Sequence, residues 1–323
     1  MPNTGSKPPK THHFIPQFQL EYFELSSGKI QQYDCKENKY SETSKGKLAA
    51  ENHLYTWTEE GGKKNPLIEV MFSKLEGQIA GVFKKIDSGD FHLNNEERSL
   101  ISFFVAMQMF RTPQNRERTK MTVEKMTKKV MKAPAFDPKV FASHIKEAGK
   151  KYPDLNNLPE SDVEDMRKMF LNEDYDLKVP NEYFLHFMIE GMKDIAQHIH
   201  ENGWVYLLAP SGSQFITSDD PYVMVKPKKP SDPFWLGPGI KVPGTEITLP
   251  LTPKICLLMS PSLVGVHSKK INQKTVRMIN LRTASNSRRF IYGGNEVLLR
   301  SLVKRLALND RGVRMPTVRV DGF

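Results

Sequence analysis

The architecture of this 323-residue chain is decided by one stretch, Asn94-Asn95-Glu96-Glu97-Arg98-Ser99-Leu100-Ile101-Ser102-Phe103-Phe104-Val105-Ala106-Met107-Gln108-Met109-Phe110-Arg111-Thr112-Pro113. Its asparagines and glutamates are typical of a helix N-terminus. The run from Leu100 to Phe110 is apolar on nearly every face, so other elements must cover it on all sides. We therefore expect a central, buried helix that Pro113 ends or kinks.

Two polar residues near the end of this run need partners. Gln108 and Arg111 lie about one turn apart and share one face of the predicted helix. A buried polar group is costly unless it is hydrogen-bonded. We expect Arg111 to pair with the carboxylate of Glu76 or Asp219, and an anionic substrate group is the alternative partner.

Helical patterns flank this segment, and short apolar runs follow them. A small hairpin is expected around the polar turn at residues 36–39. Apolar spacing predicts helices over 68–86, 113–131, 140–150, 161–171, 181–200, 273–289 and 296–308, and strands over 204–208, 214–217, 222–225, 246–249 and 255–259. This order predicts an α+β fold, with the mostly helical first two thirds packed on a small antiparallel sheet and a helical C-terminus. Residues 1–10 are expected to form a flexible tail and residues 11–323 a single α+β domain.

Composition narrows the class of protein. The two cysteines, Cys35 and Cys256, lie far apart, which argues against a disulfide scaffold or a cysteine-built zinc site and fits a reducing, cytoplasmic setting. The N-terminus lacks a signal sequence, and no run of about eighteen apolar residues occurs, so we expect a soluble protein with no membrane partner.

The charge is unevenly distributed. The formal net charge is +10, and basic blocks at 111–151 and 269–319 flank an acidic block at 154–194. The basic faces are suited to phosphate and the acidic one to a different partner, or the blocks match one another within the chain. Solvated helix faces are the alternative interpretation.

The first candidate site is the pair His12-His13, which precedes a short helix beginning near Pro16. A neutral imidazole binds metals or transfers a proton near neutral pH. Neighbours on an extended strand point to opposite faces, so we expect one active histidine. The alternative is that both imidazoles only hydrogen-bond nearby backbone. The string His-His-Phe-Ile-Pro at residues 12–16 is similar to the start of some histidine-metal finger nucleases. The Asn52-His53 pair that would match the later residues of that family lies far from His13 along the sequence.

The second candidate site is Thr217-Ser218-Asp219-Asp220-Pro221, at the end of a predicted strand. Carboxylates projecting from such a turn bind a divalent cation or act as a base. A plain turn stabilised by Asx-type hydrogen bonds is the alternative. Asn280 lies in a partly apolar helix. A polar residue in such a helix more often forms hydrogen bonds that join the helix to a sheet than it binds a substrate.

Together these strings resemble, in order and spacing, the family catalogued as domain of unknown function number 4238. The resemblance runs from about His12 to Ile291. It implies a mostly bacterial, soluble family, and it assigns no activity. The positions that carry the family pattern are His12, His13, Gln17, Gln108, Arg111, Ser218, Asp219 and Pro221.

Two hypotheses follow. The first is an enzyme that hydrolyses nucleic acid or another phosphate-bearing substrate, with a divalent metal ion as cofactor and basic blocks that hold the backbone. Its expected catalytic residues are His12, His13, Arg111 and Asp219, its substrate-binding residues Gln17, Gln108, Ser218 and Asn280, and its metal ligands His13, Asp219 and Asp220. The second is a non-catalytic nucleic-acid-binding, protein-binding or sensor protein, in which the same residues form a structural polar network.

Overall fold

A computed structural model describes residues 11–52, 57–58, 64–65, 67–177, 180–226 and 238–306 of the chain. The fold is α+β, as predicted. The chain divides into two compact units, which are residues 1–115 with 185–323 (unit 1) and residues 116–184 (unit 2). The single domain over 11–323 stays a prediction, and the predicted tail at 1–10 lies outside the described residues.

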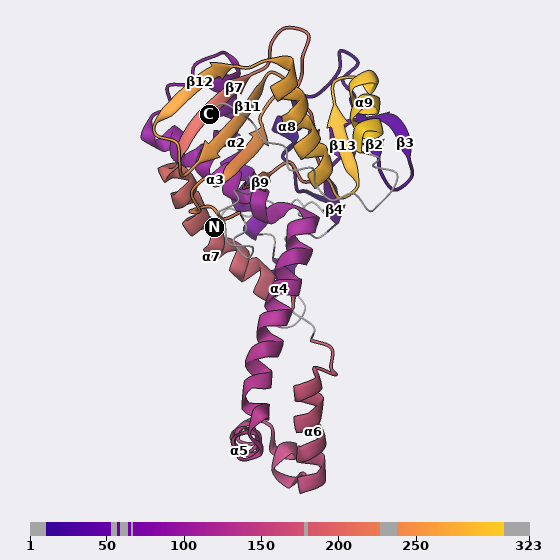
Figure 1. The fold of residues 1–323 in the computed structure, drawn as a ribbon, viewed down its shortest axis with the longest axis vertical. Helices are drawn as coiled ribbons and strands as arrows, with labels where there is room; N and C mark the ends of the chain where they lie inside the picture. The colour runs from indigo at the N-terminus through magenta and orange to yellow at the C-terminus, as the bar shows by residue number, and fades with distance from the viewer. Residues whose placement is uncertain are drawn as a thin grey trace. The chain divides into compact units, whose positions relative to one another are not determined.

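Two sheets organise unit 1 (Figure 1). Instead of one small antiparallel sheet, the described residues form a five-stranded sheet of order β12-β7-β11-β10-β9 and a four-stranded sheet of order β3-β2-β13-β8, and β12 runs parallel to β7. The strands are β2 (Ile30–Asp34), β3 (Lys39–Thr43), β7 (Gly203–Leu208), β8 (Thr217–Ser218), β9 (Val223–Val225), β10 (Glu246–Pro250), β11 (Ile255–Ser260), β12 (Val266–Lys270) and β13 (Phe290–Gly293). Two further pairs are β1 (Thr11–His13) with β4 (Ala50–Asn52) and β5 (Trp57–Thr58) with β6 (Lys64–Asn65).

The predicted central helix is confirmed as α3 (Asn95–Arg111). A capping box closes its N-terminus, because the Asn94 side chain accepts from the Glu97 N–H while the Glu97 carboxylate accepts from the Asn94 N–H. Thr112 is extended and Pro113 begins the next helix, so the proline ends α3 as expected. The helices of unit 1 are α1 (Gln17–Glu21), α2 (Leu67–Asp87), α3, α8 (Gln273–Asn286), α9 (Glu296–Leu306) and the part of α7 (Asn181–Glu201) from residue 185 onwards.

The predicted helix over 273–289 is wrong at its C-terminal end. α8 stops at Asn286, and Phe290–Gly293 forms β13, which pairs with both β2 and β8. The aromatic and β-branched residues of this segment favour a strand, and its two neighbours come from distant parts of the chain. Arg288 and Arg289 therefore lie in a loop that enters a sheet, and not on a helix.

Helix α8 packs against the hydrophobic core of unit 1 on two of its sides. Leu281 and Ala284 pack with residues of β2, β13 and α9, whereas Val276 and Ile279 pack with residues of β7 and β11. Figure 1 shows α8 between the two sheets. The buried polar residues of this helix, such as Asn280 and Asn286, therefore face strands and not solvent.

The regular secondary structure in the described part of unit 2 is helical. Asp137 caps the N-terminus of α5, and Arg167 donates a hydrogen bond to the carbonyl of Ala135 at 2.8 Å. The rings of Phe141 and Phe170 pack with centroids 5.6 Å apart. The elements are α4 (Pro113–Lys132, in unit 2 from residue 116), the 3-10 helix η2 (Ala133–Phe136), α5 (Pro138–Ala148), the 3-10 helix η3 (Pro153–Asn157) and α6 (Glu160–Asn172). In the described parts of both units, none of the helices has the length and apolar character needed to cross a membrane.

Candidate functional site

A pocket of about 590 Å³ lies in unit 1 and contains one of the predicted site residues, Asp219. Distant segments of the chain form its wall, including the turn after β2, the 3-10 helix η1 (Lys45–Lys47) with β4, and the loop before β13. The charged residues of the wall are Lys36, Lys47, Arg288, Arg289, Glu51 and Asp219, and its aromatic residues are Phe14, Phe290 and Tyr292. Cations therefore outnumber acids around this pocket.

Three of the four cations are available to a ligand. Lys36, Lys47 and Arg288 are exposed, and none of them forms an ion pair with another described residue. Arg289 is held differently, since its guanidinium binds both oxygens of Asp34 at 2.6–3.0 Å and lies 4.7 Å from the centre of the Phe290 ring. Arg289 thus fixes the edge of the pocket while the other three cations project from it.

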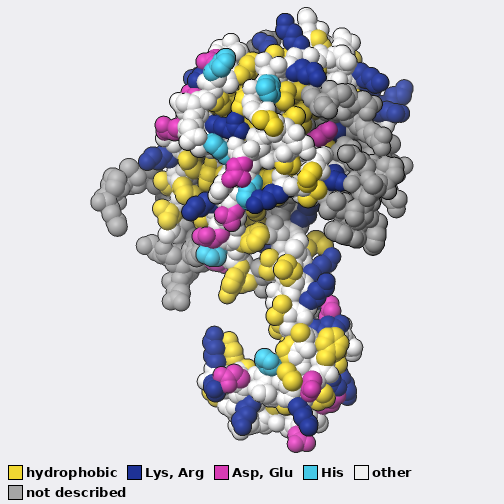
Figure 2. All heavy atoms as spheres, turned by 60° about the vertical axis from the view of Figure 1, so that its left-hand side comes forward, with side chains coloured by type: hydrophobic (Ala, Val, Ile, Leu, Met, Phe, Trp, Pro, Cys, Tyr) yellow, Lys and Arg dark blue, Asp and Glu magenta, His cyan; other side chains and the backbone are white. Residues whose placement is uncertain are grey.

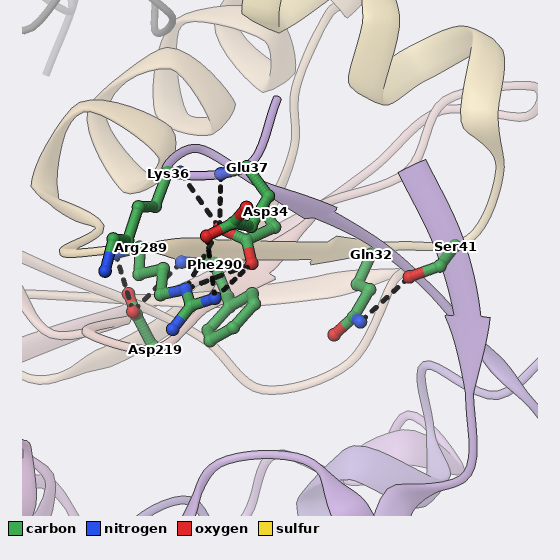
Figure 3. Close-up of polar contacts among 8 residues, drawn as sticks. All are labelled: Gln32, Asp34, Lys36, Glu37, Ser41, Asp219, Arg289 and Phe290. Atoms are coloured by element: carbon green, nitrogen blue, oxygen red, sulfur yellow. Dashed lines mark hydrogen bonds and ion pairs between the residues drawn. The ribbon is translucent and has the colours of Figure 1, made fainter. Parts of the chain in front are cut away.

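Asp219 organises the loop that carries these arginines (Figure 3). Its Oδ1 accepts from the N–H of Arg288 at 2.9 Å, and its Oδ2 accepts from the N–H groups of Arg289 and Phe290 at 2.8 and 3.0 Å. Burial raises the pKa of Asp219 to about 6, although these three donors favour the ionised carboxylate. The side chain is therefore both a loop anchor and a group that can exchange a proton near neutral pH.

Ser218 and Asp220 also make local structural contacts. The Ser218 hydroxyl accepts from the N–H of Asp220 at 3.2 Å. Asp220 Oδ1 accepts from the Thr112 hydroxyl at 3.1 Å and from the Asn115 amide at 3.3 Å. These bonds tie the end of β8 to the junction of α3 and α4, where Pro113 lines the pocket.

Asn280 forms hydrogen bonds that join α8 to an extended segment. This is the structural role that the sequence predicts as the alternative to substrate binding. Its Oδ1 accepts from the N–H of Ile216 at 3.0 Å, and its Nδ2 donates to the carbonyl of Gln214 at 2.8 Å. The side chain is 1% exposed. It therefore holds the chain entering β8 and does not line the pocket.

Arg111 is buried on α3 and pairs with Glu76, one of the two predicted partners. Its Nη1 lies 2.5 Å from Glu76 Oε1, its Nη2 donates to the carbonyl of His13 at 2.6 Å, and its guanidinium lies 4.8 Å from the centre of the Phe72 ring. The arginine side chain is only 1% exposed. Its neighbour Gln108 is fully buried, and neither polar atom of its amide has a hydrogen-bond partner among the described residues.

The two histidines point to different surroundings, as expected for neighbours on a strand. His12 is 1% exposed, and its Nδ1 lies 3.8 Å from Glu69 Oε2. His13 is partly exposed, with Nε2 3.3 Å from the Gly46 carbonyl and 3.3 Å from Gln17 Nε2. Burial lowers the pKa of His13, which favours its neutral form.

Of the predicted site residues only Asp219 lines the pocket, and the others do not converge inside it. Asp219 lines it, Arg111 binds the main chain of β1 behind it, and Asp220 binds the α3–α4 junction. No group of three or more His, Cys, Asp or Glu side chains in the described part of the chain is placed to hold a metal ion. The predicted ligand set of His13, Asp219 and Asp220 is therefore not assembled.

The cations that line the pocket are not among the predicted ligand-binding residues. The local sequence pattern predicts a turn at Lys36 and a helix at Arg288. The adjacent arginines at 288–289, next to an aromatic–aliphatic run, were the signal that could have indicated a loop before a strand.

Comparison with known proteins gives one match. A family model described as a protein of unknown function (DUF4238) matches residues 11–296. No curated protein and no solved structure matches the chain.

Proposed function

The chain belongs to the DUF4238 family of proteins of unknown function, and we propose that it binds a phosphate-bearing ligand, of the nucleotide or nucleic-acid class, in the pocket lined by Lys36, Lys47 and Arg288. The observation that carries this proposal is the convergence on one concave surface of three exposed cations from separate segments, none of which forms an ion pair within the described part of the chain. Lysine and arginine are the side chains that most commonly bind phosphate oxygens.

The partly exposed ring of Phe290 in the wall favours a ligand that also has a ring system, and the buried rings of Phe14 and Tyr292 lie behind the surface. Phe290 and Tyr292 are nearly parallel, with an interplanar angle of 14° and centroids 6.2 Å apart, and Phe14 lines the same pocket. Proteins that bind single-stranded nucleic acid combine cations for the backbone with aromatic rings for the bases. Inorganic phosphate alone would use only the cationic half of this wall.

The buried network supports binding by holding the wall in place. Arg111 and Asp219 bind main-chain groups of segments that border the pocket, and Asn280 binds the chain that enters β8. A pocket whose walls are fixed before the ligand arrives loses less conformational entropy on binding. This arrangement agrees with the hypothesis of a binding protein with a structural polar network.

Binding is tested by fluorescence anisotropy with a labelled single-stranded oligonucleotide, and by competition with mononucleotides and inorganic phosphate. The Lys47→Glu and Arg288→Glu variants should each bind about tenfold or more weakly, because a charge-assisted hydrogen bond contributes about 1.5–3 kcal/mol. Lys274→Glu, at an exposed position on α8 outside the pocket, is the matched control and should bind as the wild type does. Failure of all these ligands to bind, or wild-type affinity in both pocket variants, would refute the proposal.

Hydrolysis of a phosphate ester is a second candidate, and the position of Asp219 in the pocket favours it. A water molecule would attack phosphorus, the Asp219 carboxylate would take its proton, and the leaving oxygen would receive a proton from solvent. Activity would then rise with pH through about 6, the pKa of Asp219. A rate that falls or stays constant over this range, or no cleavage of an oligonucleotide that binds, would exclude this role.

A further inference from the structure

Unit 2 separates its charges into two halves. Residues 116–151 carry 11 lysines and arginines against 4 acids, and residues 152–177 carry 8 acids against 2 basic residues. The positive half contains α4 and α5, whereas the negative half contains α6 and the segment that follows it. The unit as a whole is therefore strongly polarised although its net charge is small.

Few ion pairs within unit 2 join its positive half to its negative half. Lys132 and Glu173 join the two halves at 3.1 Å. Pairs such as Lys128–Glu124 and Arg167–Glu164 are local to one half. Opposite charges are thus left on different parts of one surface.

The segment after α6, residues 173–176, leaves acidic side chains exposed on the surface of unit 2. Glu173 binds Lys132, and the Tyr175 ring lies 5.1 Å from the Lys128 ammonium, so both residues contact α4. Asp174 and Asp176 alternate with them and are exposed, with no ion pair to another described residue. Two carboxylates that form no ion pair within the described part of the chain therefore lie on the outside of this segment.

One exposed face of α4 has the opposite charge and is also apolar. Lys125 and Lys129 are exposed and form no ion pair with another described residue. Met126 and Val130, one turn apart and next to Lys129, are 64 and 71% exposed, and Met121, on the other side of the lysines, is 53% exposed. Figure 2 shows apolar, basic and acidic side chains next to one another on the surface of the unit. Exposed apolar side chains that adjoin one another and are bordered by charged residues, as Met126 and Val130 are, mark a surface that another molecule covers.

We infer that unit 2 pairs with unit 2 of a second copy of the chain, so that Lys125 and Lys129 of each copy face Asp174 and Asp176 of the other. In a two-fold contact each of these interactions occurs twice, which suits a unit that carries both charges. A nucleic acid or an anionic membrane would attract the positive half and repel the negative one. The methionines and Val130 would be removed from water in the same contact.

A charge-swap experiment on the full chain tests this pairing by sedimentation velocity. Wild type should form dimers that weaken with added salt. Lys125→Glu/Lys129→Glu and Asp174→Lys/Asp176→Lys should each dissociate at least about tenfold more readily, because like charges then face each other. An equimolar mixture of the two variants should restore the dimer. Lys274→Glu/Lys304→Glu, on α8 and α9 of unit 1, is the matched control and should dimerise as wild type does.

Circular dichroism first establishes that each variant is folded. A monomeric wild type, dimers unaffected by both charge reversals, or a mixture that stays monomeric would each overturn the inference. A monomeric wild type whose nucleic-acid binding is lost in Lys125→Glu/Lys129→Glu would assign this face to nucleic acid instead, and would equally overturn it.

Discussion

Arg111 on α3 donates a hydrogen bond from Nη2 to the main-chain oxygen of His13, at 2.6 Å. His13 lies on β1, which pairs with β4, and Ala50 and Glu51 of β4 line the pocket. The central helix therefore supports one wall of the pocket through a buried guanidinium. This relationship gives Arg111 a positioning role that needs no contact with a ligand.

Replacing Arg111 should destabilise the fold and weaken ligand binding together. Arg111→Met keeps most of the side-chain volume but leaves Glu76 unpaired and the His13 carbonyl without this donor. We expect a loss of about 3 kcal/mol in the free energy of unfolding, at the lower end for a broken buried pair because Glu76 is 23% exposed. Urea unfolding followed by circular dichroism measures this loss.

The double variant Arg111→Met/Glu76→Gln provides the control for this pair. It should be more stable than the sum of the two single losses predicts, because the second change removes the unpaired carboxylate. Lys74→Met, at an exposed position on the same helix as Glu76, should change stability by no more than about 0.5 kcal/mol. Additive losses, or an Arg111→Met variant as stable as wild type, would show that the pair does not support the fold.

The titration of Asp219 should make the free energy of unfolding fall as the pH rises, which is the opposite of the effect of a carboxylate with a lowered pKa. Its pKa is raised from 3.8 to about 6 by burial, so between these values the folded chain binds more protons than the unfolded chain. Its contribution to stability is thus full below about pH 4 and falls as the pH rises, by about 3 kcal/mol in total, before levelling off above about pH 6.

The comparison of wild type with Asp219→Asn isolates this effect, since the variant does not titrate at this position. The difference in unfolding free energy, wild type minus variant, should fall from pH 4 to pH 6. A difference that rises over this range would mean that the N–H groups of Arg288, Arg289 and Phe290 outweigh burial and lower the pKa.

The sequence predicted what depends on neighbours along the chain. The capping residues of α3 follow from helix chemistry. The need to neutralise a buried charge left Glu76, Asp219 or an anionic substrate group as the partner of Arg111, and the structure pairs it with Glu76. β13 and the pocket were not predictable in this way, because they depend on distant pairings such as Arg289 with Asp34, which are 255 residues apart. Predicting the pocket would have required knowing that the loop at 288–289 meets the turn after β2.

His13 should titrate below its ordinary pKa of 6.5, because burial disfavours the charged imidazole. The folded chain then binds fewer protons here than the unfolded chain, so stability is lost as the pH falls through 6.5. Nuclear magnetic resonance of the imidazole nitrogens measures this pKa directly. Glu76 raises it, so Glu76→Gln should lower it further, and an upward shift in that variant would contradict the assigned electrostatics.

Gln108 should reduce stability in the wild type. The side chain is fully buried on α3, and neither its Oε1 nor its Nε2 has a hydrogen-bond partner among the described residues. An unsatisfied buried polar group costs about 1–3 kcal/mol, so Gln108→Met, which has a similar volume, should raise the free energy of unfolding by about 1–2 kcal/mol.

Gln19→Met is the matched control, because Gln19 is equally buried but only its Oε1 is without a hydrogen-bond partner among the described residues, while its Nε2 donates to the carbonyl of Pro250 at 2.9 Å. That variant should lose stability where Gln108→Met gains it. If Gln108→Met is instead destabilised, a buried water must satisfy the amide in solution. If it is stabilised and also binds the oligonucleotide more weakly, the unpaired amide is retained for function at the expense of stability, as functional residues often are.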